Sequence, residues 1–338
     1  MRLRTARKTI LLASALVILL SVTASMVLLT ACTREADAPE TVRIGAVTQG
    51  IGGLVFIADE LGYFKRRGIN AEIKKYDAGA FAVDALLGDE VDVAAAAEFV
   101  LVQKGFDHRD LRTFGQIADA KTMGIVARKD HGIEKPPDLK GKKIGLTRGS
   151  VSDFFLGRFL ERESIPLSGV RMVDLAPTPA EEALSHGSVD ALMLWEPNVG
   201  RMVERLGENA VSLPIQGRDD FYVLLVTKEG FLRKSPLAAE KMLRALIDAE
   251  EFADKHPEDA PRIIDRRAGS RQGDARLAAA KCTLAVRLDQ ALLPLMEAEA
   301  HWMIRNNLTP KREMPNYFDM IYLKALEAVK PDAVGIIH

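Results

Sequence analysis

The feature that most constrains this chain is a pattern of alternating strand and helix that occurs twice. In the first copy, Gly88 follows a predicted helix and the pair Val91-Asp92 enters a predicted strand; in the second, Gly187 precedes Val189-Asp190. The two Val-Asp pairs lie 98 residues apart (190 − 92). Alternating strands and helices predict a parallel sheet with helices on both faces. We therefore expect an α/β fold made of two similar lobes.

The first copy begins at "TVRIGAV", which alternates as a strand and leads into the glycine-rich turn "TQGIGG". Apolar residues from Leu54 to Phe64 then recur at helical spacing. The segment "INAEIKKY" alternates as a second strand, "DAGAFAVDALLGD" predicts a turn and a short helix, and "EVDVAAAA" predicts a buried strand. This order of elements is that of one α/β unit.

The second copy repeats this order with "KKIGLT" as a strand, "SVSDFFLGRFLERE" as a helix and "VRMVDL" as a strand. In "PTPAEEALSHG", Thr178 is the predicted N-cap, Pro179 the first helical residue and Glu181 the partner of a capping box. The segment "VDALMLW" is the next predicted strand. From Ser235 onward the pattern is nearly all helical, and we expect this tail to pack on the first lobe.

The first forty residues have the parts of an export signal. Four cations (Arg2, Arg4, Arg7 and Lys8) precede an uncharged run from Thr9 to Leu29, which ends in Leu29-Thr30-Ala31-Cys32. That tetrapeptide resembles the bacterial lipobox, which implies lipidation of Cys32. An uncleaved membrane anchor is the alternative, because about 20 apolar residues can span a bilayer. The next residues, "TREADAPE", suit a flexible tether.

Charge and cysteine content narrow the functional classes. Removing the four cations of the signal changes the net charge of −1 to about −5, which argues against nucleic-acid binding. Without Cys32, only Cys282 remains, so there is no disulfide framework, and we expect this thiol to be a small buried core residue. About 300 mature residues exceed one comfortable core, which again predicts two lobes.

Ligands of open α/β sheets bind beyond the carboxyl ends of the strands, where this sequence collects five turns. The turn at Gly149 to Ser152 either caps a helix or cradles an anion with its amides and hydroxyls. Trp195 either belongs to the core or forms a wall of a cleft. Glu98 either caps the next helix or meets a cationic group of the ligand. The turns are Thr48 to Gly53, Asp77 to Ala80, Ala95 to Glu98, Arg148 to Ser152 and Trp195 to Pro197.

The absence of familiar catalytic and cofactor motifs argues against an enzyme. The stretch "GIGGLV" follows a strand, but Val55 stands where the third glycine of a dinucleotide fingerprint belongs. The sequence contains no G-x-S-x-G, P-loop or H-E-x-x-H, and its six histidines show no metal-ligand spacing. We therefore predict no catalytic residue, no cofactor and no metal site.

Four segments together resemble the substrate-binding proteins of ABC importers for sulfonates, taurine, nitrate and thiamine precursors. They are "FIADELGYFKRRGINAEI", "LLGDEVDVAAAAEF", "DLKGKKIGLTRGSVSDFFLGRFL" with "LAPTPAEEALSHGSVDALMLWEPNV", and "PNYFDMIYLKALEAVKPDAVGIIH". The resemblance implies a type II periplasmic binding protein, with two α/β lobes, a hinge and a helical C-terminal segment. The expected parts are a signal at 1–31, a tether at 32–41, the first lobe at 42–124 and 221–338, and the second lobe at 125–220.

The resemblance also implies function and site. It implies a monomeric protein outside the cytoplasmic membrane, anchored by lipid, which passes a small molecule to a permease and its ATPase. An enzyme resembling the pyrimidine synthases of thiamine biosynthesis, and a ligand-sensing lipoprotein, are the alternatives. The extra residue in "LLGDEVDV" leaves the register of the third loop open. By position, the ligand-contacting residues are Gln49, Gly50, Ile51, Gly52, Asp77, Ala78, Gly79, Ala96, Ala97, Glu98, Gly149, Ser150, Val151, Ser152, Trp195 and Glu196.

Overall fold

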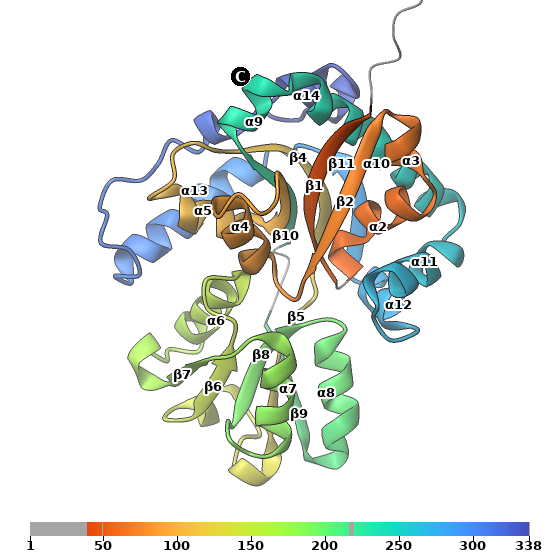
Figure 1. Cartoon of the computed structure of the whole chain (residues 1–338). Coiled ribbons are helices and arrows are strands. Elements are labelled where there is room, and N and C mark those ends of the chain that lie inside the picture. Colours follow the sequence, from red (N-terminus) through yellow and green to blue (C-terminus); the bar gives the residue numbers. More distant parts are fainter. Residues whose placement is uncertain (1–38, 49, 216–219, 338) are drawn as a thin grey trace, which may run out of the picture. The chain divides into compact units, whose positions relative to one another are not determined.

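The computed structural model describes residues 39–48, 50–215 and 220–337. The predicted signal (1–31), Cys32, most of the tether and Gln49 lie outside these residues. Residues 41–338 form one compact unit, in which the strands make two separate sheets (Figure 1).

The first sheet has six strands in the order β11-β4-β10-β3-β1-β2. β1 and β3 are parallel, whereas β10 runs antiparallel to both β3 and β4, and β11 runs antiparallel to β4. β3 is buried along its whole length and separates the first α/β unit from the returning strand β10. The strands are β1 (Glu40–Val47), β2 (Ile69–Tyr76), β3 (Val93–Ala97), β4 (Leu111–Ala120), β10 (Phe221–Lys228) and β11 (Cys282–Arg287).

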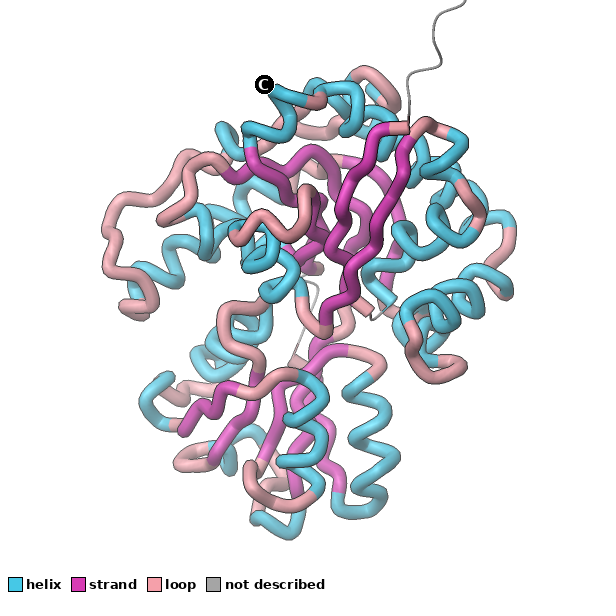
Figure 2. The backbone as a smooth tube through the Cα atoms, in the orientation of Figure 1, coloured by secondary structure: helices cyan, strands magenta, loops and turns pink. Residues whose placement is uncertain are grey.

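The second sheet has five strands in the order β7-β6-β8-β5-β9. β6 is parallel to both β7 and β8, whereas β5 is antiparallel to β8 and to β9. Helices α6, α7 and α8 accompany this sheet (Figures 1 and 2). The elements are β5 (Met123–Arg128), β6 (Lys143–Leu146), α6 (Val151–Arg162), β7 (Arg171–Asp174), α7 (Pro177–Ser185), β8 (Ala191–Trp195), α8 (Asn198–Leu206) and β9 (Ala210–Pro214).

The remaining helices accompany the first sheet. Among them, α10 and α11 pack against α2, and α13 packs against α5, so the C-terminal part packs on the first sheet as expected. The helices are α2 (Gly53–Glu60), α3 (Tyr63–Arg66), α4 (Gly79–Leu87), α5 (Glu98–Gly105), α9 (Glu229–Lys234), α10 (Pro236–Lys255), α11 (Asp259–Ala268), α12 (Asp274–Ala279), α13 (Leu292–Arg305) and α14 (Lys324–Glu327). Short 3₁₀ turns lie at Gly50–Gly52, Lys129–His131, Pro136–Leu139, Leu167–Gly169, Gly207–Asn209, Phe318–Met320 and Pro331–Ala333.

The aspartate of the repeated Val-Asp pair makes the same hydrogen bond to a parallel strand in both sheets. Asp92 accepts a hydrogen bond from the Arg43 amide at the start of the parallel neighbour, at 2.8 Å, and Asp190 accepts one from the Lys143 amide at 2.7 Å. The amides of both aspartates donate back to the carbonyls of those same residues. Each carboxylate therefore fixes the register of two parallel strands, and the predicted α/β repeat is confirmed.

The structure corrects two predictions, one of sheet topology and one of helix capping. The sheets are mixed, not wholly parallel, because β5 and β10, which follow the two crossings between the sheets, enter antiparallel. Helix α7 begins at Pro177 with Ala176 as its N-cap, so the predicted Thr178 capping box is wrong; Pro177 takes the first helical position, which its fixed φ favours. Glu181 instead pairs with Arg201.

The C-terminal region is less helical than predicted. Cys282 opens strand β11, and it is half-buried instead of fully buried because β11 is the edge strand of its sheet. The stretch "PNYFDMIYLKALEAVK" contains only a 3₁₀ turn and the single turn α14. Propensity did not decide these segments, because strand pairing and packing are made only in the folded state.

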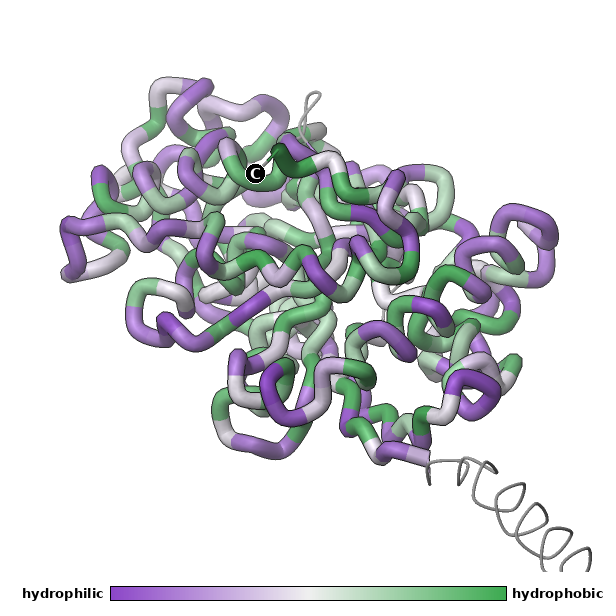
Figure 3. Tube along the Cα trace, turned by 90° about the horizontal axis from the view of Figure 1, so that it is seen from above, coloured by the Kyte–Doolittle hydropathy of each residue, from purple (hydrophilic) through white to green (hydrophobic). Residues whose placement is uncertain are grey.

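Apolar residues form a core that includes side chains of both sheets, and a smaller cluster lies around α7 and α8. Hydrophilic stretches gather on outer turns in Figure 3. Within residues 39–337, apart from the short gaps, no helix has the length and apolar character that a membrane span requires.

Candidate functional site

A small cavity lies between the two sheets, where the predicted loops meet. Seven predicted ligand residues line it: Ile51, Ala78, Gly79, Ala97, Ser150, Val151 and Trp195. Val47, Ala80, Val100 and Phe221 complete the wall. Its volume is about 30 Å³, which is enough for a water molecule but not for an organic ligand.

Helix N-termini converge on this cavity. Its lining includes residues at or just before the starts of α2, α4, α5 and α6. The first amides of a helix have no intrahelical partner, and the helix dipole places partial positive charge there. Among the described residues that line it, there is no lysine, arginine, aspartate or glutamate. Backbone amides are therefore the groups that could hold a charged solute.

Helix α4, like α2, begins without a capping side chain. Its N-cap is Ala78, which provides no side-chain cap, and its first turn carries no acidic residue. Gly79, at the first helical position, packs closely against the end of β3: a Cβ there would lie 2.7 Å from the Ala96 Cα. Glycine is therefore needed at this position, because any larger residue would move α4 away from β3 and from the cavity wall.

Helix α6, where we expected the anion cradle, caps itself. The Ser150 hydroxyl donates to the Thr147 carbonyl at 2.7 Å and accepts from the Ser152 amide at 3.2 Å. Asp153 accepts from the Gly149 amide at 2.5 Å and forms an ion pair with Arg148 at 3.1 Å. Burial raises the pKa of Asp153 to about 6, although Arg148 and the Gly149 amide oppose this shift.

The Ser152 hydroxyl is the group at this turn that keeps binding capacity. It is fully buried, and no described residue forms a hydrogen bond with it. Ser150 has used its only proton, so it could donate to an anion only if its bond to Thr147 broke.

The other predicted residues are distributed around the cavity. Asp77 lies in a neighbouring polar cleft of about 430 Å³ instead of the small cavity. Gly52, Ala96, Glu98, Gly149, Ser152 and Glu196 adjoin lining residues in sequence without being part of the lining. Position 49 is outside the described residues.

The polar cleft contains an ion-pair network that joins the two sheets' units. Arg201 of α8 pairs with Asp274 of α12 at 2.7 Å and with Glu181 of α7 at 2.8 Å. It also donates to Asn198, the first residue of α8. Arg201 thereby pairs with two of the three acidic residues that line the cleft, and the third, Asp77, is exposed.

An aromatic cluster also joins helices α5 and α13 to helix α6. Phe99 and Trp302, from the first sheet's helices, contact Phe154 of α6 with ring centroids 6.0 and 5.4 Å apart. The Trp302 indole N–H donates to Glu161 of α6 at 3.1 Å. Gly157 makes room for this indole, since a Cβ at that position would lie 2.1 Å from it.

Sequence reasoning missed several residues of the site. Val47 directly precedes one predicted turn and Ala80 ends another, yet neither was among the predicted ligand-contacting residues, so adjacency was an available signal. Phe221 is the first residue of β10, the strand with which the chain returns to the first sheet. Its place at that return was the only signal for it in the sequence. The pairing of Glu98 with Glu299, described below, had no local signal.

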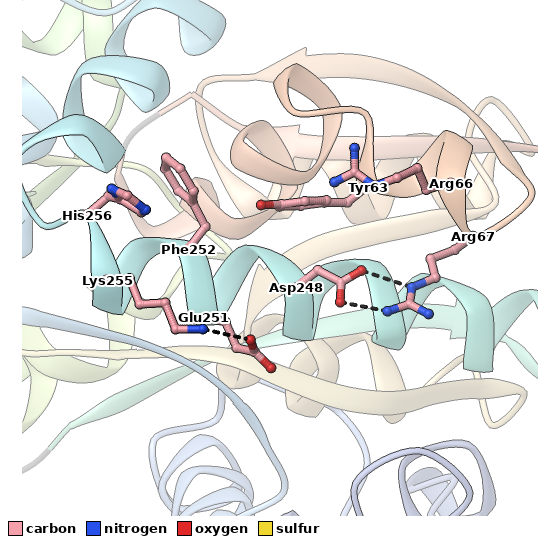
Figure 4. Close-up of a pocket in the computed structure, with 8 residues that line it drawn as sticks. All are labelled: Tyr63, Arg66, Arg67, Asp248, Glu251, Phe252, Lys255 and His256. Carbon is pink, nitrogen blue, oxygen red and sulfur yellow. Dashed lines mark hydrogen bonds and ion pairs between the residues drawn. The ribbon is translucent and has the colours of Figure 1, made fainter.

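A third hollow, of about 550 Å³, lies between α3 and α10 and contains none of the predicted loop residues (Figure 4). Its charges are largely paired: Arg67 with Asp248 at 2.7 Å and Lys255 with Glu251 at 3.2 Å. Arg66 lies over the Tyr63 ring. We therefore place the candidate site at the cavity between the sheets.

Known proteins resemble this chain along most of its length. The family described as NMT1/THI5 like matches residues 52–260. A Brucella abortus protein, whose name describes it as a binding protein, is 24% identical over 225 residues, which are 65% of this chain and 69% of that protein. The taurine-binding periplasmic protein of Escherichia coli is 25% identical over 193 residues, which are 56% and 59% of the two chains.

Solved structures share the fold at low sequence identity. The alkanesulfonate-binding protein SsuA from Xanthomonas axonopodis pv. citri, bound to MOPS, superposes with a TM-score of 0.73 at 18% identity, covering 85% of this chain and 100% of that one. The desulfurization enzyme DSZB superposes with a TM-score of 0.64 at 17% identity, covering 86% and 98%. The fold therefore supports both binding and catalysis, and residues must decide between them.

Proposed function

Because this chain belongs to the NMT1/THI5-like family, we propose that it is an extracytoplasmic binding protein that captures a small anion, with sulfonates as the first candidates. The observation that supports this most is the convergence of helix N-termini on an apolar cavity without charged side chains. Such a site can hold a sulfonate or nitrate with amides alone. Each hydrogen bond to a charged group contributes about 1.5–3 kcal/mol, and micromolar affinity needs about 8 kcal/mol net.

Capture requires the cavity to open, because about 30 Å³ cannot admit an alkanesulfonate. We propose that residues 42–124 with 221–338, and residues 125–220, are two rigid lobes that close over the solute about a hinge. The ion pair of Arg201 with Asp274 is then a contact that forms on closure. Arg201 is half-buried and Asp274 buried in this arrangement.

Delivery to an ABC permease and its ATPase, and a lipid anchor at Cys32 in the periplasm or at the cell exterior, complete the proposal. In cell fractionation, a Cys32→Ser variant should be lost from the membrane fraction and found in the soluble fraction, whereas a Cys282→Ser variant should remain with the membranes. Equal distribution of the two variants would argue against the anchor.

An enzyme is the second candidate, because DSZB has the same fold. The described thiol does not favour it: burial raises the pKa of Cys282 to about 12, so the nucleophilic thiolate is scarce at neutral pH. Mixing the protein with ethanesulfonate or taurine and following both compounds by NMR tests this directly. Accumulation of a product would overturn the binding proposal.

The sharpest test of the site is Ala78→Asp, which places a carboxylate at the N-cap of α4. Aspartate is a favourable N-cap, but this one would occupy the amides proposed for the anion and would repel it. We expect calorimetric affinity for ethanesulfonate to fall at least about tenfold. Ala176→Asp adds the same residue at the N-cap of α7, away from the cavity, and should leave the affinity unchanged. Equal affinities of the two variants would contradict the proposed site.

A further inference from the structure

Two carboxyl groups meet in the interior directly behind the candidate site. Glu98 is the first residue of α5 and Glu299 lies in α13, and both are fully buried. The two carboxyl groups lie close enough for each to shift the pKa of the other. The second Glu98 oxygen accepts from the Tyr222 amide at 2.7 Å. No described residue forms a hydrogen bond with Glu98 Oε1 or with either Glu299 oxygen, so these three buried oxygens lack a donor.

A hydrogen bond between two carboxyl groups requires a proton on at least one of them, because ionised carboxylates only accept. Burial raises the pKa of Glu98 to about 8 and raises the pKa of Glu299 well above its usual value, where nearby Glu98 adds to the effect. Two buried carboxylates without a cation cannot both ionise at neutral pH. The pair is therefore an uncharged, proton-holding unit.

The other groups around the pair do not replace this proton. The titratable side chains that interact with it are Tyr222 of β10 and Tyr317, whose hydroxyl donates to the Val102 carbonyl of α5. Burial raises the pKa of both tyrosines, so both are neutral at physiological pH. Among the described residues, no lysine, arginine or histidine forms an ion pair with either glutamate.

The pair stands one residue behind the cavity wall. Ala97, Val100 and Phe221 line the cavity, and the pairing of Val223 with Ala97 brings Tyr222 beside Glu98. Glu98 directly follows Ala97, the N-cap of α5, which is itself part of the cavity wall. An ionised Glu98 would place a negative charge at the start of α5, whose N-terminus faces the cavity.

We propose that the Glu98–Glu299 pair makes anion binding depend on a proton: the site accepts an anion while Glu98 is protonated and loses affinity when Glu98 ionises. This inference rests on the proposed function. By linkage, a bound anion must hold the proton more tightly by the same factor by which ionisation weakens binding. The protein would therefore capture an anion more readily where the surroundings are neutral or acidic than where they are alkaline.

Calorimetry of ethanesulfonate binding between pH 6.5 and pH 9.0 tests the proposal. The anion has no proton to lose in this range, so any change in Kd belongs to the protein. We expect the wild-type protein to bind about tenfold more weakly at pH 9.0, because the negative charge of an ionised, buried Glu98 is poorly screened from the bound anion. Glu98→Gln should abolish this change, because glutamine keeps the acceptor for Tyr222 and cannot ionise.

Glu299→Gln is the matched variant, because its amide still donates to Glu98 and leaves Glu98 free to titrate. It should keep a pH dependence, moved to lower pH because a hydrogen bond from an amide favours the ionised form of Glu98, whereas Glu98→Gln loses the dependence. A merely structural pair predicts equal behaviour of the two variants. Wild-type binding with the same Kd at both pH values would overturn the proton coupling alone.

Unfolding experiments separate failure of the coupling from failure of the proposed function. An acid whose folded-state pKa is raised is stabilising only while protonated, so stability should fall as pH rises from about 4 to about 8. Glu98→Gln should reduce this fall in urea titrations. If ethanesulfonate and taurine bind at no pH while this difference is seen, the proposed function and the coupling are overturned and the buried proton is retained; if the difference is absent, the buried proton is overturned too.

Discussion

The two copies of the α/β unit use equivalent carboxylates in two different ways. Asp92 and Asp190 stand at the same place and make the same bond to the neighbouring strand. Glu98 and Glu196, which directly follow β3 and β8, are also 98 residues apart and are both buried. Glu98 meets Glu299, whereas Glu196 meets the ammonium of Lys281 at 2.7 Å and accepts from the Gly200 amide.

The difference shows what a repeated sequence pattern can fix. The aspartates contact strands of their own copy, so duplication preserves their partners. The glutamates face elements that have no counterpart in the other copy: α13 for Glu98 and the start of β11 for Glu196. The glutamate that follows the buried strand therefore faces a second carboxyl group in one copy and a cation in the other.

The largest effects should come from the equivalent aspartates. Asp92→Ala and Asp190→Ala each leave a strand amide without its acceptor, and each should lower the free energy of unfolding by about 2–3 kcal/mol. Urea unfolding measures both. Values that differ by more than about 1 kcal/mol would show that the two copies are equivalent in geometry and not in energy.

Lys281→Met would give Glu196 a surrounding without a cation, like that of Glu98. The Glu196 side chain is 9% exposed and that of Lys281 is 51% exposed. Solvent therefore screens part of the pair, and we expect a loss of about 1–2 kcal/mol at pH 7, less than for a fully buried pair. Lys121→Met, which removes a more exposed pair with Asp220, is the control and should cost less than about 0.5 kcal/mol. Equal costs would mean that Glu196 does not need its cation.

Acid should affect the two aspartates alike. Burial by itself would raise the pKa of Asp92 and of Asp190. Hydrogen bonds from Arg43 to Asp92, and from the Lys143 amide and the His131 ring to Asp190, outweigh burial, and both pKa values are lowered. Their stabilisation is present above the unfolded pKa of about 4 and is lost as pH falls through the lower folded value. The double variant Asp92→Asn with Asp190→Asn should show a smaller loss of stability between pH 5 and pH 2.5, followed by circular dichroism; an unchanged acid response would contradict this assignment.

The smallest effect concerns the first helix of each copy. Helix α6 begins with the capping hydroxyl of Ser150, whereas α2 begins with Gly52, where a Cβ would lie 2.6 Å from the Val47 carbonyl oxygen. Ser150→Ala should cost about 1 kcal/mol and Ser150→Gly only a few tenths. Thermal unfolding distinguishes them. Because both variants lack the hydroxyl, a cost of Ser150→Gly equal to that of Ser150→Ala would contradict the expected advantage of glycine over alanine at this N-cap.

Several parts of the fold and site could be predicted from the sequence because they depend on neighbours along the chain. Alternating strand and helix patterns, the glycine turns and the position of each turn after its strand gave the α/β units and brought seven of the predicted loop residues to one cavity. Periodicity reports which face of an element is apolar, and the carboxyl ends of parallel strands meet by construction.

Tertiary structure alone decided which charges meet. Glu98 and Glu299 are 201 residues apart (299 − 98), and Arg201 and Asp274 are 73 residues apart. No local pattern marks such pairs, because a carboxylate reads the same in sequence whether its neighbour is a proton-sharing acid or a cation. Burial and the partner set its charge, and both exist only after distant segments have packed together.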